Sequence, residues 1–91
     1  MKSINWKIIQ SNIQEALEEL KGLAGSINSS NKPDEVELEL KLRHVYHHLN
    51  FVWNIRNTST ERYANLSDSD FKNWGTFPKG FDTLETFGNE D

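Results

Sequence analysis

The residues of this chain best suited to chemistry are three histidines, His44, His47 and His48, which lie within one short stretch. In a helix, positions four residues apart lie on the same face, so His44 and His48 are spaced to bind one metal ion. Glu37 lies on the same flank of that helix and is a third, weaker candidate ligand. The zinc-peptidase pattern requires a glutamate directly after the first histidine, where this chain has Val45. The spacing is therefore compatible with a metal site but not with a zinc peptidase.

The histidines also have an explanation without a ligand. They lie between polar and apolar positions of one helix, where an imidazole ring packs by its carbons and keeps its nitrogens in water. The sequence has no cysteine and no histidine elsewhere that would complete a tetrahedral site, although a second chain could supply ligands. We therefore predict no cofactor, and metal binding by His44 and His48 is the alternative hypothesis.

Other patterns typical of enzymes are missing from the sequence. No serine stands in a G-x-S-x-G turn, there is no cysteine nucleophile, and no glycine-rich loop suits a phosphate group. Two acidic pairs, Glu18/Glu19 and Asp68/Asp70, are explained by solvation of a helix face and by helix capping. The sequence therefore predicts that the protein is not an enzyme.

The N-terminal third of the chain has the apolar periodicity of a helix. Apolar residues recur at spacings of three and four, which predicts a helix over about 4–27. Gly25 and the polar residues after it predict the end of this helix and a loop. The apolar seam of the helix consists of Trp6, Ile9, Ile13, Ala16, Leu20, Leu23 and Ile27.

A second helix is predicted over about 33–57, and its extension to 65 is left open. Pro33 suits a first helical position, and acidic residues follow where the helix dipole favours negative charge. One apolar seam consists of Leu38, Leu42, Val45, Leu49 and Val52, and it is expected to pack against the first helix, with Leu49 in its middle. A second stripe lies on nearly the opposite side and consists of Val36, Leu40, His44, His47, Phe51 and Ile55. A helix with two apolar faces packs between two neighbours.

The C-terminal third predicts a short helix and an aromatic extension. Ser67 and Asp70 form a capping pattern that opens a helix over about 68–74, and residues 75–91 follow as the extension. Half of the ten aromatic residues lie beyond residue 66, namely Phe71, Trp74, Phe77, Phe81 and Phe87. The predicted fold is one small all-α domain over 1–91, a long antiparallel helical hairpin with a short third helix and this extension.

The second stripe of the second helix has two explanations. The C-terminal aromatic residues can fold over it within one chain, or a second copy can pair with it to form a four-helix bundle. In the second case the protein is a homodimer. The predicted interface residues are then Val36, Leu40, His44, His47, Phe51 and Ile55.

Composition narrows the class of function. The net charge is −4 and no basic stripe exists, so nucleic acid is not a predicted partner. No apolar run approaches the roughly 20 residues of a membrane span, and the lack of a signal sequence and of cysteine predicts a cytoplasmic location. We predict a non-enzymatic protein–protein interaction module, a small adaptor or regulator that pairs with itself or with another protein. The alternative is a histidine-dependent metal-binding protein or minor enzyme that uses His44 and His48.

Overall fold

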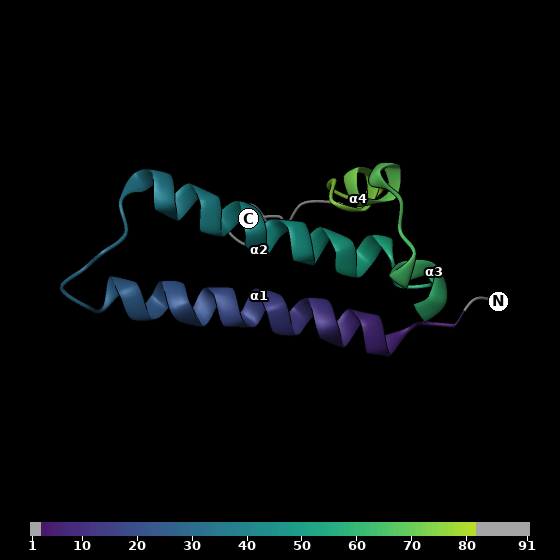
Figure 1. Cartoon of the computed structure of the whole chain (residues 1–91), viewed down its shortest axis with the longest axis horizontal. Helices are drawn as coiled ribbons and strands as arrows, with labels where there is room; N and C mark the ends of the chain where they lie inside the picture. The colour runs from purple at the N-terminus through teal and green to yellow at the C-terminus, as the bar shows by residue number, and fades with distance from the viewer. Residues whose placement is uncertain (1–2, 82–91) are drawn as a thin grey trace, which may run out of the picture.

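The computed structural model describes residues 3–81, which form four helices. Their bounds are Trp6–Ile27 for α1, Glu35–Asn54 for α2, Thr60–Ala64 for α3 and Asp68–Trp74 for α4. The long helices α1 and α2 lie side by side and antiparallel, and α3 and α4 lie near the C-terminal end of α2 (Figure 1). The predicted all-α hairpin followed by a short helix is confirmed. The predicted role of Phe87 falls in residues 82–91, outside the described part of the chain.

Polar side chains define where each helix begins. Asn5, Asp34, Ser59 and Ser67 are the N-caps of the four helices, and each accepts a hydrogen bond from the backbone N–H three residues later. This bond satisfies one of the amide groups that the first turn of a helix leaves unpaired. At α4 the capping is reciprocal, because Asp70 Oδ2 accepts a hydrogen bond of 2.9 Å from the Ser67 N–H.

Asp70 also connects the two short helices. Its carboxylate lies 2.6 Å from Nη1 of Arg62 in α3, and this contact is the main reason why the pKa of Asp70 is lowered to about 2. The hydrogen bonds from Ser67 lower the pKa of Asp70 further. Arg62 in turn lies over the Trp74 ring, 5.3 Å from its centroid. The pair therefore joins α3 to both ends of α4.

The lowered pKa of Asp70 predicts a loss of stability in acid. The folded chain holds this carboxylate ionised below the pH at which the unfolded chain, with a pKa of about 3.9, takes up a proton. The contribution of Asp70 is therefore full above about pH 4 and is lost as the pH falls towards 2. We expect the urea midpoint of the wild type to fall more steeply over this window than that of Asp70→Asn. A carboxyl ¹³C titration that places Asp70 near its ordinary pKa would contradict the ion pair.

The second long helix is shorter than the predicted 33–57, and its extension to 65 is wrong. It ends at Asn54, and residues 55–57 form a turn in which the Thr58 N–H donates to the Ile55 carbonyl at 2.8 Å. The stretch from Asn57 to Thr60 contains only poor helix formers, whose side chains compete for backbone hydrogen bonds. Because the chain turns here, residues 60–64 form the separate helix α3.

The main apolar core lies where the first turn of α1 and the short helices α3 and α4 meet the C-terminal end of α2. Phe51 of α2 and Ile55, the residue directly after this helix, pack with Ile8 of α1 and are 3% and 0% exposed. Tyr63 and Trp74 pack against this group, with their rings stacked at a centroid distance of 6.2 Å. The short C-terminal helices therefore cover the C-terminal half of the second stripe within one chain.

The seam between the two long helices is rotated relative to the predicted one. Ile9, Ala16 and Leu23 are buried as expected, but the alternate seam residues Trp6, Ile13, Leu20 and Ile27 are exposed. Asn12, which lies outside the predicted seam, is 2% exposed. On α2, Val45 is buried whereas Leu49 is 45% exposed, so the expectation that Leu49 packs in the middle of the seam is wrong. The physical reason is that polar side chains of α1 find hydrogen-bond partners on α2, which brings them into the contact.

Candidate functional site

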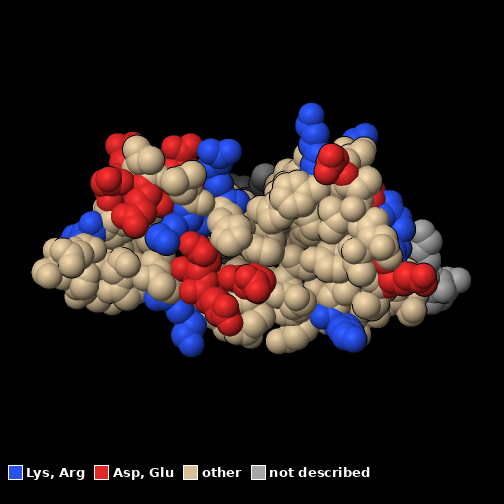
Figure 2. Space-filling view, viewed as in Figure 1, with Lys and Arg blue, Asp and Glu red and all other residues tan. Residues whose placement is uncertain are grey.

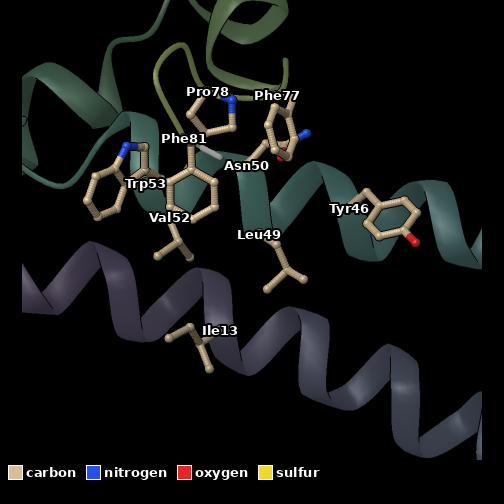
Figure 3. A pocket seen from close by; sticks show the side chains of 9 residues that line it. All are labelled: Ile13, Tyr46, Leu49, Asn50, Val52, Trp53, Phe77, Pro78 and Phe81. Carbon is tan, nitrogen blue, oxygen red and sulfur yellow. The ribbon is translucent and has the colours of Figure 1, made fainter. Parts of the chain in front are cut away.

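One side of the hairpin carries an apolar groove between α1, α2 and residues 76–81. The groove has a volume of about 710 Å³, and Leu49 and Ile13 extend into it from the two facing helices (Figure 3). Trp53 lies between the Arg56 guanidinium, 3.8 Å from the centre of its ring, and the Phe81 ring at 5.0 Å. The groove is lined by Ile13, Tyr46, Leu49, Asn50, Val52, Trp53, Phe77, Pro78 and Phe81.

Two asparagines of α2 hold the segment that closes this groove. Asn50 Nδ2 donates to the Gly75 carbonyl at 2.8 Å, and Asn54 Nδ2 donates to the carbonyls of Trp74 and Thr76, each at 2.9 Å. Gly75 must lie close to α2, since an added Cβ would come within 3.1 Å of a ring nitrogen of His47. The segment is thus positioned by hydrogen bonds, and its aromatic side chains remain available on the surface.

The apolar surface extends along the hairpin beyond the groove. Leu17 and Leu20 follow Ile13 along α1 at helical spacing, and Leu38 precedes the groove residues on α2. All three leucines are 37–45% exposed. We define the apolar face by nine exposed side chains: Ile13, Leu17, Leu20, Leu38, Tyr46, Leu49, Trp53, Phe77 and Phe81.

The opposite side of the hairpin carries a continuous chain of polar contacts. His44 and Tyr46 are two residues apart on α2, so they project to opposite sides of it. His44 Nδ1 lies 3.1 Å from Glu19 Oε1, and His48 Nδ1 lies 2.8 Å from Asn12 Oδ1. The two imidazoles face one another, with their Nε2 atoms 3.2 Å apart. His44 and His48 therefore lie on one face of α2, as the sequence spacing predicts.

Neighbouring groups and burial lower the pKa values of Glu19 and His48 in this network. The hydrogen bond from His44 is the main reason why the pKa of Glu19 is lowered, and Lys41, 3.4 Å from its carboxylate, lowers it further. Burial lowers the pKa of His48, which keeps its ring neutral to lower pH than a solvated imidazole. Glu19 is therefore a carboxylate, and His48 is a neutral ring at neutral pH.

His47 and Glu37 do not belong to this network. The His47 ring packs against Phe51 and Phe71, at centroid distances of 4.4 and 4.7 Å, and burial lowers its pKa. Within residues 3–81, no three histidines, cysteines or carboxylates gather as a metal-binding group, so Glu37 does not join His44 and His48 as a third ligand. The sequence cluster of three histidines is thus divided between two environments.

The residues predicted as an interface do not form one open surface. Val36 and Leu40 are 66% and 58% exposed on the N-terminal half of α2, and His44 is half-exposed. His47 is partly covered, and Phe51 and Ile55 are in the core. The larger exposed apolar surface is the apolar face. It takes Ile13, Leu20, Leu38 and Leu49 from the two predicted seams and adds flanking apolar residues such as Leu17.

Acidic side chains lie close to the histidine network. On the face that Figure 2 shows, acidic side chains gather over the middle of α1 and the N-terminal half of α2, and fewer of them lie near α3 and α4. The carboxylates of Glu15 and Glu19 lie near enough to His48 to raise its pKa against the larger effect of burial. This side of the molecule therefore favours cations.

Comparisons with known proteins do not connect the chain to a family, because no family model, no curated protein and no solved structure matches it. No helix in the described part of the chain combines the length and hydrophobicity that crossing a membrane requires.

Proposed function

We propose that the protein is a non-enzymatic interaction module that pairs with a second copy of itself through the apolar face. The observation that carries this proposal is the extent of the surface. A large apolar or aromatic side chain accounts for roughly 150–250 Å², so nine of them at 37–61% exposure present on the order of 800 Å². The largest apolar patch of a typical monomer is about 300–600 Å², and one partner of a standard interface contributes about 800 Å².

The form of the surface favours a second copy as the occupant. Two antiparallel helices that present one apolar side pack against an identical pair to give a four-helix bundle, which closes by two-fold symmetry. The nine side chains are all uncharged, so two such faces meet without burying an unpaired charge. The charged histidine side, in contrast, stays in water in this arrangement.

This proposal changes the interface that the sequence predicted. The stripe that contains Phe51 and Ile55 is used within the chain, because α3 and α4 pack over its C-terminal half. The exposed remainder, Val36 and Leu40, is too small to match a standard interface. The four-helix bundle is therefore proposed again, now through the other side of the hairpin.

Sedimentation velocity over a concentration series tests the proposal with two matched variants. Leu49→Glu places a charge in the middle of the apolar face, and we expect it to weaken association at least 100-fold, because the charge would be buried without a partner. Leu40→Glu changes a residue of the same type on the same helix, 58% exposed and outside the apolar face. We expect this variant to dimerise as the wild type does.

The possible outcomes distinguish a second copy of the chain from a different protein as the partner of the apolar face. A wild type that stays monomeric at the highest soluble concentration contradicts self-association and leaves a different protein as the partner. Dissociation by Leu40→Glu, with Leu49→Glu still dimeric, would instead assign the interface to the stripe predicted from the sequence. Circular dichroism of both variants must match the wild type, so that unfolding is not mistaken for dissociation.

A further inference from the structure

Asn12 determines which ring nitrogen of His48 carries the proton. The Asn12 side chain is 2% exposed, and its Nδ2 donates to the Ile8 carbonyl at 2.9 Å and to the Tyr63 hydroxyl at 3.1 Å. A carbonyl oxygen only accepts, so this atom is the amide nitrogen, and the atom that faces His48 is the amide oxygen. The oxygen accepts the hydrogen bond of 2.8 Å, so His48 Nδ1 carries the proton. In the neutral ring, Nε2 then has a free lone pair.

Glu19 determines in the same way which ring nitrogen of His44 carries the proton. Its carboxylate, 3.1 Å from His44 Nδ1, accepts a hydrogen bond, so the proton of the neutral His44 ring lies on Nδ1. Its Nε2 lone pair therefore also points away from α1. Two acceptors on α1 thus orient two rings on α2 so that both free nitrogens face each other.

Two lone pairs at 3.2 Å repel one another unless a cation lies between or beside them. In a tetrahedral zinc site the metal–nitrogen distance is 2.0–2.1 Å, which places two imidazole nitrogens about 3.3 Å apart. In a square-planar or octahedral site, adjacent nitrogens are about 2.9 Å apart. The observed separation lies between these values, so the pair has the spacing of a metal chelate.

We propose that His44 and His48 bind one divalent transition-metal ion of the zinc or copper type through their Nε2 atoms. Imidazole nitrogen suits these borderline metals, whereas Mg²⁺ and Ca²⁺ prefer oxygen ligands. Hydrogen bonds from Nδ1 to a carboxylate and to an amide oxygen are the outer-shell arrangement that orients metal-binding histidines. The half-exposed His44 leaves the remaining coordination positions open to water.

The competing explanation is a shared proton. If His44 is an imidazolium, its Nε2–H donates to His48 and Glu19 is its counterion, and the same distances follow. This alternative gives a network without affinity for metal ions. Because the pair lies on the opposite side of the hairpin from the apolar face, either state is independent of dimerisation.

Zinc titration of protein that carries no histidine tag and has been treated with a chelator tests the proposal. We expect saturable binding of one Zn²⁺ per chain and a rise in Tm of roughly 10–20 °C when zinc exceeds the Kd 100-fold. Mg²⁺ at the same concentration should leave Tm unchanged. Long-range ¹H–¹⁵N spectra should show zinc-dependent shifts at Nε2 of His44 and His48 and not at His47.

Three variants make the result specific. His44→Gln should abolish the Tm rise caused by zinc, each variant being compared with its own metal-free form. His47→Gln removes a neighbouring histidine outside the pair and should retain the rise. Glu19→Gln should weaken zinc binding 10–100-fold while both ligands remain, because outer-shell partners have effects of this size. A zinc response that survives in His44→Gln, or a wild type that does not respond to zinc or copper, overturns the proposal.

Discussion

Replacement of Phe51 by alanine is expected to destabilise the chain by about 3–5 kcal/mol, the range for removing a buried phenylalanine. Phe51 is 3% exposed and lies at the centre of the core. Its ring packs edge-on against Tyr63 and Trp74, at centroid distances of 6.3 and 5.9 Å. The side chain therefore connects α2 to both short helices, and its loss leaves a cavity that these elements share.

Urea unfolding followed by far-UV circular dichroism measures this effect. Phe77→Ala is the matched control, because Phe77 is 56% exposed on the apolar face, and we expect a loss below about 1 kcal/mol in the monomer. A domain of this size has a total stability of about 5–14 kcal/mol, so Phe51→Leu is the milder variant if Phe51→Ala does not fold. Equal losses for Phe51→Ala and Phe77→Ala would show that the core is placed wrongly.

The helices were predictable because their signals are local. Periodicity over successive turns and the cap at Ser67 depend on residues within a few positions of one another. The expectation of Pro33 at the first helical position was wrong, because Asp34 is the N-cap and α2 begins at Glu35. The end of α2 was harder to predict from local signals. The poor helix formers from Asn57 onward indicated a break, but whether packing overrides them depends on residues distant in sequence.

The rotation of the hairpin seam could not be predicted from apolar spacing. A pattern search places Asn12 and Glu19 on a solvated face because both are polar. Their partners His48 and His44 lie 36 and 25 residues further along the chain, so the contact satisfies polar groups that periodicity assigns to water. The structure thus pairs the helices through a polar seam that a purely apolar template excludes.

The candidate sites were predictable to different degrees. That His44 and His48 lie on one helix face follows from their spacing of four residues. The acceptors that orient both rings, however, are on α1. The apolar face depends on which side of α2 the short helices cover. Because α4 takes the side of His47 and Phe51, no helix of residues 3–81 covers the side of Leu49. That choice is made by long-range packing and has no local signal.

Asn12→Ala should cost about 2–4 kcal/mol, because it removes a buried side chain and leaves hydrogen-bonding groups without partners. The amide accepts from His48 and donates to Tyr63 and to the Ile8 carbonyl, so it joins α1 to both α2 and α3. Gln14→Ala is the matched control, since Gln14 lies on the same helix and makes only an exposed contact with Glu18. Its expected loss is within about 0.5 kcal/mol.

A double-mutant cycle isolates the contact of Asn12 with Tyr63. Tyr63→Phe removes the hydroxyl and leaves the ring in the core, and we expect it to lose about 0.5–1.5 kcal/mol by itself. In the Asn12→Ala background that hydroxyl no longer has its amide partner, so Tyr63→Phe should then cost almost nothing. Strictly additive losses in urea unfolding would mean that the 3.1 Å contact is not formed in solution. In that case the Ile8 carbonyl alone would fix the Asn12 amide with its oxygen towards His48.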